Sequence, residues 1–350
     1  MPAVHDPSSD HLFVRRFLIG LLLVGLALLA WHLAEVLLLV FGASLVAVIL
    51  RAIADPIAEK TRLSSRLALL VAVLFVFSLI GLAGWLFGAE IASQASTLRE
   101  TLPAAWKSFE ERLGDTQIGE RILGALRDAA KDGGSVASEL GSFALTFGSA
   151  VADFLLVLVA GVFLAAEPRL YRRGLVKLFP RERHDEIASA LDNTGRALRK
   201  WLLGQLVSMT IIGVFTGLGL WLVGVPSALM LGLIAGLAEF VPLLGPILAA
   251  VPGLLLALLA GPETALWALG VYLVIQQIES NLVTPLVEKK AVSIPPVITL
   301  FGVLALGVIF GVLGVLLAAP LTVVIYVLVK QLYVREALGE ATHVPGEPGS

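Results

Sequence analysis

Two apolar stretches in the second half of the chain, 226–259 and 295–329, constrain the fold more than any other feature. Each is longer than thirty residues, and Glu239 is the one charged residue in either. A straight helix of about 33 residues measures roughly 50 Å, whereas the hydrocarbon core of a bilayer is about 30 Å thick. Neither stretch therefore fits one simple membrane-spanning helix.

Both stretches are interrupted by glycine and proline, and the interruptions correspond. A shift of 69 residues places Pro226 on Pro295 and Gly245 on Gly314. Irregular backbone at membrane depth is tolerated where protein encloses it or where it lines a watery cavity. Paired broken segments of this kind are typical of the binding region of secondary transporters. The residues that we expect to break the helices are Pro242, Gly245, Pro246, Pro252, Gly311, Gly314 and Pro320.

The composition of the whole chain is that of a membrane protein. Hydrophobic residues make up 58% of the sequence and charged residues 15%, against about 25% charged residues in a soluble domain. Hydropathy predicts an all-α polytopic membrane protein with about eight membrane segments, two of which are the broken stretches. A formal net charge of −2 offers no footprint for nucleic acid, and the absence of cysteine excludes disulfides and thiolate chemistry.

Hydropathy and charge divide the chain into seven segments. They are an N-terminal tail, helical hairpin and basic turn (1–66), a third span (67–90), an extracytoplasmic insertion of two small amphipathic helices (91–142), a fourth span (143–166), a basic cytoplasmic segment (167–201), a core transport region (202–334) and a tail (335–350). Within the first segment, we expect a turn near Trp31 to split the apolar run. The tail is rich in glycine, proline and glutamate, so we expect it to be disordered.

Lysine and arginine predict the orientation. They gather before the first span, between the second and third spans, and in the basic segment. Because positive loops stay in the cytoplasm, we expect a multi-pass protein of the bacterial inner membrane with both termini cytoplasmic. If both broken stretches cross the membrane, Lys289 and Lys290 lie outside; if both are re-entrant hairpins, these lysines lie inside. We favour two hairpins that enter from opposite faces and form an inverted repeat.

The basic segment also carries an apolar stripe at helical spacing. The stripe consists of Ile187, Leu191, Thr194, Leu198 and Trp201. A helix with one apolar face and charges opposite it is typical of a helix that lies at the membrane interface, and we favour that position. The alternative is a soluble helix that packs on another cytosolic helix.

A cluster of polar residues ends the span between the two broken stretches. Gln277, Ser280, Asn281 and Thr284 share one helical face, and Glu279 lies within the cluster. Polar groups in lipid cost free energy without a partner, so we expect these residues to face protein or water and to bind the transported solute or ion. The structural alternative is that they bond neighbouring helices and hold the fold together.

Glu239 is the more specific candidate for a functional residue, because it lies in an apolar run just before the first break. A carboxylate that faces lipid costs at least about 2 kcal/mol, and burial disfavours its charged form. This position suits a group that couples transport to protons or cations. The alternative is a carboxylate near the aqueous mouth that caps the amides of a helix end.

Sequence motifs of competing enzyme classes are missing. The chain has no phosphate-binding glycine loop, no HExxH pair and no nucleophile elbow, and its five histidines are scattered. We therefore expect no catalytic residue, no metal centre and no cofactor.

Several motifs together resemble one known family of membrane proteins. They are Gly204-Gln205-Leu206, Glu239-Phe240-Val241-Pro242 with Gly245-Pro246 and Pro252, Gln277-Ile278-Glu279-Ser280-Asn281 with Pro285, and Gly311, Gly314 and Pro320. The chain is similar in these motifs to the autoinducer-2 exporter family, also called the AI-2E or PerM family. The resemblance implies a transporter of the inner membrane. Some members export autoinducer-2, and others exchange sodium or lithium for protons.

Three functions follow as alternatives. Export of a small solute such as autoinducer-2 would use amide and hydroxyl groups such as those of Gln277, Asn281 and Thr284. A cation/proton antiporter would need Glu239 or Glu279. The rival from a different class is a scaffold or channel that drives no solute. Glycine and alanine at the breaks also suit close helix approach and a homo-oligomer.

Overall fold

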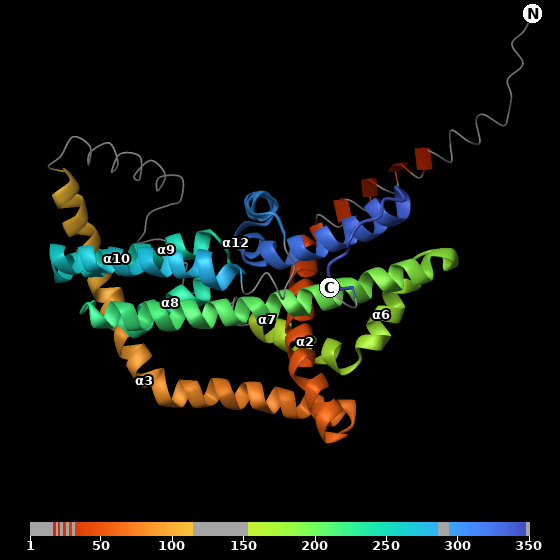
Figure 1. Ribbon diagram of the computed structural model, residues 1–350, viewed down its shortest axis with the longest axis horizontal. Coiled ribbons are helices and arrows are strands. Elements are labelled where there is room, and N and C mark those ends of the chain that lie inside the picture. The colour runs from red at the N-terminus through yellow and green to blue at the C-terminus, as the bar shows by residue number, and fades with distance from the viewer. Residues whose placement is uncertain are drawn as a thin grey trace, which may run out of the picture.

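The computed structural model describes residues 32–114, 153–285 and 294–347, together with separate positions between 17 and 29. Within these residues the regular structure is entirely helical. Figure 1 shows the helices α2 (Ala34–Thr61), α3 (Ser65–Gly114), α6 (Pro168–Val176), α7 (His184–Leu222), α8 (Ala228–Ala238), α9 (Leu244–Ala260), α10 (Pro262–Ile278) and α12 (Pro296–Leu328). An unlabelled helix, Asp153–Ala166, precedes α6. Two π-helical turns, η2 (Glu279–Val283) and η3 (Val329–Ala337), continue α10 and α12. The predicted all-α fold is confirmed.

Among the described residues, four helices are long and apolar enough to cross a membrane. They are α2, the first part of α3, α7 with the short 3-10 turn before it, and α12 with η3, which is counted by length and composition although it is folded at Gly311. The helix Asp153–Ala166 and α6 together make a fifth candidate, bent by 85° between its two parts. The helices α8 and α9 are apolar but shorter. The chain is therefore a multi-pass membrane protein.

The first broken stretch folds as a helical hairpin, as predicted. The helix α8 ends at Ala238 and α9 begins at Leu244. Pro242 lies between them and cannot donate the amide hydrogen bond that a continuous helix would need. Leu243 turns the chain with a φ of 71°. Gly245 then packs directly on the end of α8, where a Cβ at this position would lie 2.1 Å from the carbonyl oxygen of Ala238.

The second broken stretch is also a hairpin, folded at Gly311 inside α12. Gly311 has φ 62° and ψ −143°, a conformation that favours glycine. The two arms pack together: a Cβ on Gly302 would lie 2.5 Å from Thr322 Oγ1, and a Cβ on Gly314 would lie 2.0 Å from Leu306 O. Residues on opposite sides of Gly311 are therefore neighbours.

Both hairpins pack along α7, which runs the length of the molecule in Figure 1. The helix α8 approaches α7 through glycines, and a Cβ on Gly232 would lie 2.6 Å from Gly217 Cα. The absence of side chains at such positions lets two helices come close together. The second arm of α12 packs on the other half of α7, where Leu202 shares a buried core with Val323. The helix α7 is thus the common support of the two hairpins.

The turns of the two hairpins reach the same core. Phe240 from the first turn packs against this core, as do Phe310 and Leu313 from the second. The rings of Phe240 and Trp201 of α7 meet edge to face, with centroids 6.1 Å apart. The breaks that correspond in sequence therefore converge in space.

The helix α3 is longer than we expected. We predicted a span ending near 90 and a separate amphipathic helix ending near Gly114, but α3 is one helix of 50 residues. Gly88 and Pro103 lie inside it without ending it, and its direction changes midway, as Figure 1 shows. The second expected helix of the insertion, residues 143–152 of the fourth span, and Lys289 and Lys290 lie outside the described residues. The helix α2 begins next to the expected turn near Trp31, which is itself not described.

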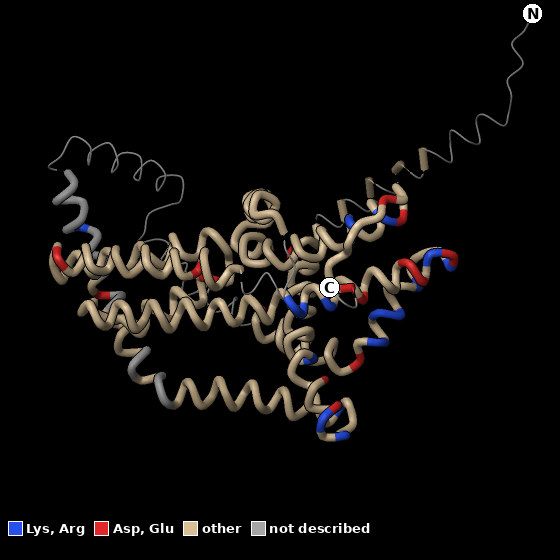
Figure 2. Tube along the Cα trace, in the orientation of Figure 1, with Lys and Arg blue, Asp and Glu red and all other residues tan. Residues whose placement is uncertain are grey.

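The basic segments gather at one end of the molecule. Figure 2 shows lysine and arginine in the turn between α2 and α3, in α6, at the start of α7 and around η3. These segments are far apart in sequence. Their gathering is the arrangement that the positive-inside rule requires of loops on one side of a membrane.

The apolar stripe of the basic segment does not belong to a separate interfacial helix. The stripe forms the first turns of α7, and Ile187, Thr194 and Leu198 are buried. Leu198 packs on Val327 of α12 and on Val344 of the tail. The expected interfacial position is therefore wrong for this stripe, which packs inside the protein. The alternative, a soluble helix packed on another cytosolic helix, does not describe it either, because the stripe is continuous with the long apolar helix α7.

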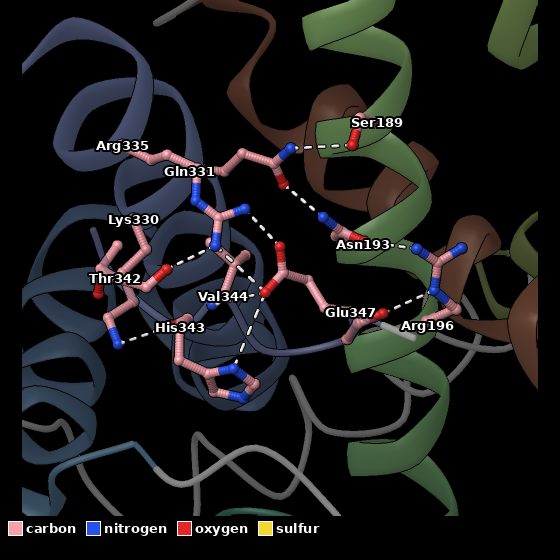
Figure 3. A network of polar contacts seen from close by, with 11 residues as sticks. Ser189, Asn193, Arg196, Lys330, Gln331, Arg335, Thr342, His343, Val344 and Glu347 are labelled. Carbon is pink, nitrogen blue, oxygen red and sulfur yellow. Dashed lines mark hydrogen bonds and ion pairs between the residues drawn. The ribbon is translucent and has the colours of Figure 1, made fainter. Parts of the chain in front are cut away.

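The tail also differs from our expectation of disorder. Residues 329–337 form η3, and the following segment turns back onto α7. Val344 is completely buried in the core. Figure 3 shows the polar contacts around it: Arg335 pairs with Glu347, and Arg196 Nε of α7 donates to Gly346 O over 2.6 Å. The composition predicted disorder, but one buried valine and several charged hydrogen bonds hold the segment in place.

Candidate functional site

Glu239 lies at the turn of the first hairpin, directly after α8. Its backbone amide continues the helical pattern by donating to Ala235 O, and its carbonyl accepts a hydrogen bond from Gln205 Nε2 of α7. The residue is only 3% exposed. Gln205 thus fixes the hairpin turn to α7, and the Glu239 side chain is held inside the protein.

The carboxyl group of Glu239 lies beside that of Glu279. Oε2 of Glu239 is buried, and no amide, hydroxyl or cationic group of the described residues donates a hydrogen bond to it. The two carboxyl groups are close enough for a side-chain hydrogen bond. Such a bond requires that one of the two carboxyl groups carry a proton, because two carboxylates only accept. A proton shared by the two carboxyl groups would therefore link the hairpin turn to the end of α10.

Glu279 begins a π-helical turn. The residues Glu279–Val283 continue α10 with wider hydrogen bonding. Single π-turns inside helices occur frequently at functional sites. Gln276 Nε2 donates to Glu279 Oε2 over 3.1 Å, one turn earlier on the same helix. This contact helps to orient the Glu279 carboxyl group.

A cavity of about 190 Å³ opens next to Glu279. It lies between α7, α8, α9 and α10, and most of its wall is apolar. Its hydrogen-bonding groups come from Thr216, Tyr272, Gln276 and Glu279. At about 30 Å³ per water molecule, it has room for roughly six waters or a small solute. Glu279 thus faces a space that water can fill, whereas Glu239 is not part of the cavity wall.

Tyr272 forms one wall of this cavity. Its hydroxyl group donates to Ala249 O of α9 over 3.3 Å. A Cβ on Gly253 would lie 2.0 Å from this hydroxyl oxygen, so the glycine makes room for the tyrosine. The position of Tyr272 is therefore set by a glycine that lies nineteen residues earlier.

The remaining polar residues of the predicted cluster lie apart from the carboxyl pair. Gln277, Ser280 and Asn281 are exposed, and Thr284 is half-buried. Ser280 Oγ donates to Gln276 O, and Asn281 Nδ2 donates to both oxygens of Gln277. Among the described residues, these hydrogen bonds all lie within the one helix. The structure thus brings Glu239 and Glu279 together, whereas Gln277, Ser280 and Asn281 face away from other described helices.

The predicted breaking residues fall into two roles. Pro242 and Gly311 lie at the two turns, and Gly245 and Gly314 provide the close contacts within the hairpins. Pro246 lines the cavity near the start of α9. Pro252 lies inside α9, and Pro320 lies fully buried inside α12.

Sequence reasoning missed part of the cavity wall. Thr216 and Tyr272 were not among the predicted site residues, because each lies in a helix that reads as an ordinary apolar span. The available signal was weak: Thr216 is one hydroxyl in a run of glycine and aliphatic residues. Gln205 entered only through a family motif, and its hydrogen bond to the hairpin turn depends on the fold.

These features define a class of protein. A multi-pass helical membrane protein with two packed hairpins, and with a buried carboxyl pair beside a small cavity, has the architecture of a membrane transporter. The chain belongs to the AI-2E transporter family, because the sequence model described as "AI-2E family transporter" matches residues 19–334. The predicted resemblance is confirmed.

Individual relatives are named for transport in general terms. The chain is 29% identical over 182 residues to "Putative transport protein YrrI" of Bacillus subtilis, covering 51% of this chain and 52% of the relative. It is 36% identical over 186 residues to "Putative transport protein MT0215" of Mycobacterium tuberculosis, covering 51% of this chain and 49% of the relative. It is 28% identical over 130 residues to the permease PerM of Escherichia coli, covering 37% of each. The chain spans about half the length of the first of these relatives.

Proposed function

We propose that this protein is a proton-coupled secondary transporter in which the Glu239–Glu279 pair carries the coupling proton. The observation that supports this proposal best is the buried Oε2 of Glu239, which lies next to a second carboxyl group and has no other partner among the described residues. A purely structural carboxylate in a protein interior has hydrogen-bond donors or a cation as partners. This pair has a proton or a bound cation as its natural partner.

Exchange of a proton for a monovalent cation fits the site best. When the shared proton leaves, two carboxylates remain side by side, and a cation relieves their repulsion. Oxygen ligands from Glu279 and Tyr272 and water in the cavity are suitable partners for a small hard cation. The competition of proton and cation for one pair of carboxylates is the simplest form of antiport.

Export of a small polyol-like solute such as autoinducer-2 is the second candidate. Thr216, Tyr272 and Gln276 give the cavity wall hydroxyl and amide groups beside the carboxyl pair. Such groups bind polyols through hydrogen bonds. In this case Gln277, Asn281 and Thr284 would form an outer part of the solute route, and the proton would drive export.

Flux measurements in proteoliposomes test both candidates. Sodium or lithium efflux and autoinducer-2 efflux should be measured separately, with and without an imposed pH gradient. We expect Glu279→Gln to abolish the response to the pH gradient. Glu263→Gln, which removes a carboxyl group from the exposed first turn of the same helix, is the matched control and should retain it. Gradient-driven flux unchanged by Glu279→Gln would refute the coupling role.

The orientation in the bacterial inner membrane is part of the proposal. Basic segments at one end support a cytoplasmic position for that end and for both termini. Figure 1 shows the far end of α3 and α6 at opposite ends of the molecule. Single cysteines that replace Lys107 and Arg173 should therefore react with impermeant reagents from opposite sides. Reaction of both from the same side would reverse this conclusion.

A further inference from the structure

A large cleft lies at the basic end of the molecule, away from the carboxyl pair. Its volume is about 930 Å³, and α2, the start of α3, the end of the helix Asp153–Ala166, α6 and α7 form its walls. Six arginines and three acidic residues line it, which leaves a formal excess of three positive charges. The arginines are Arg51, Arg66, Arg169, Arg173, Arg196 and Arg199.

Most of these arginines already have partners. Arg51 donates to Ala165 O over 2.6 Å and pairs with Asp55, and Arg199 donates to the same carboxylate and to Ala52 O. Arg66 pairs with Glu167 over 3.2 Å at the exposed rim. The third acid, Asp192, accepts hydrogen bonds from two nitrogens of Arg172, which lies outside the cleft wall. The acids of the cleft are thus neutralised within the protein.

Arg169 and Arg173 are the arginines of the cleft wall that remain to be considered. Within the described part of the chain, neither guanidinium group has a hydrogen bond or an ion pair. The two residues are separated by one turn of α6, so they share a face, and both line the cleft. Two guanidinium groups at this spacing are suited to bind one phosphate through several charge-assisted hydrogen bonds.

The surroundings of the cleft indicate a lipid rather than a soluble anion. The helix α6 is bent by 85° from the apolar helix Asp153–Ala166, so it runs along the membrane surface when that helix crosses the membrane. Leucines of the same region are exposed: Leu170 is 60%, Leu175 50% and Leu178 78% exposed. An amphipathic segment with this exposure places its apolar side chains at the headgroup and acyl boundary.

We infer that this cleft binds the headgroup phosphate of an anionic phospholipid, clamped between Arg169 and Arg173 of α6. The lipid would join α6 to the ends of α2 and α7. The cleft is independent of the carboxyl pair and of the substrate that is transported.

The test compares lipid binding by two charge-matched variants. The purified protein in detergent is titrated with phosphatidylglycerol or with phosphatidylcholine, and bound lipid is counted by native mass spectrometry. We expect preferential retention of phosphatidylglycerol, and a loss of roughly tenfold or more in its affinity in the double variant Arg169→Gln/Arg173→Gln. The control Arg181→Gln/Arg183→Gln removes the same charge from the next exposed segment outside the cleft and should bind like the unchanged protein.

Three results would overturn the inference. They are equal retention of the two lipids, an equal loss in both double variants, and displacement of phosphatidylglycerol by millimolar inorganic phosphate, which would identify a soluble anion as the ligand. If the cleft variant does not fold, the single variants Arg173→Gln and Arg181→Gln make the same comparison with one charge each.

Discussion

The first hairpin, α8 with α9, and the second hairpin, folded at Gly311, share the same backbone device but place different side chains at the turn. Gly245 and Gly314 correspond in sequence, and each packs against a carbonyl oxygen of the opposite arm. In the same alignment Glu239 corresponds to Val308, and Pro242 corresponds to Gly311. Glu239 is 3% exposed, whereas Val308 is 88% exposed. Both copies of the repeat therefore keep the glycine contact that lets the chain fold back on itself. At the compared position, only the first copy carries an ionisable group inside the protein.

The largest expected effect tests the shared device. Gly245→Ala and Gly314→Ala should each destabilise the protein by about 1–3 kcal/mol, because the new Cβ meets a backbone oxygen that cannot move without opening the hairpin. Gly270→Ala is the control, since a Cβ at that helical position has nothing within 4 Å. Melting of the detergent-solubilised variants measures the difference. If one hairpin tolerates its alanine as well as Gly270 does, the two turns are not equivalent.

The next prediction tests the difference in chemistry. Glu239→Gln keeps the size of the side chain but cannot exchange a proton, so we expect proton-dependent flux to fall by at least about tenfold. Val308→Ala, at the corresponding position of the second hairpin, should leave flux within about twofold, because that side chain is exposed. Fluxes across an imposed pH gradient in proteoliposomes provide the comparison. Equal losses in the two variants would show that both turns act through packing.

A smaller effect concerns the tail, which supports the second hairpin and has no counterpart at the first. The hydrogen bond from Arg335 holds the pKa of Glu347 below its ordinary value of 4.5. The stabilisation is therefore fully present above that value and is lost as the pH falls through the lowered pKa. We expect this stabilisation of the docked tail to be about 1 kcal/mol. Its loss should be measurable as faster amide hydrogen exchange of residues 338–347 on acidification.

Glu347→Gln provides the control for the tail. This variant should exchange faster already at neutral pH and should show little further change below pH 5. The same acid-induced loosening in Glu347→Gln and in the unchanged protein would mean that another group controls the docking.

The smallest expected effect separates the two faces at the end of α10. Gln277→Leu should change cation/proton exchange by less than about twofold, because this side chain is exposed and its amide oxygens accept from its own helix. Gln276→Leu removes the donor that orients Glu279 and should have the larger effect. Autoinducer-2 efflux lost in Gln277→Leu, with cation exchange intact, would instead assign the outer face to solute export.

The sequence alone determined the membrane class and the two breaks, and it singled out Glu239 as a candidate. These conclusions depend on local properties. Long apolar runs need a nonpolar environment, Pro242 cannot continue a helix, and a carboxyl group among aliphatic residues is costly wherever the chain places it. The positions of Gly245 and Gly314 could also be predicted, since internal similarity reports equivalent backbone conformations.

The tertiary structure alone decided which groups meet. Glu239 and Glu279 are forty residues apart, and only the return of the first hairpin alongside α10 makes them a pair. The tail illustrates the same limit. Its composition is that of a disordered segment, yet Val344 is buried in one apolar core with residues of α7 and α12. Composition measures the average tendency of a segment to be buried. Contacts between distant segments depend on geometry that no local window contains, and at Val344 one such contact is enough to order the chain around it.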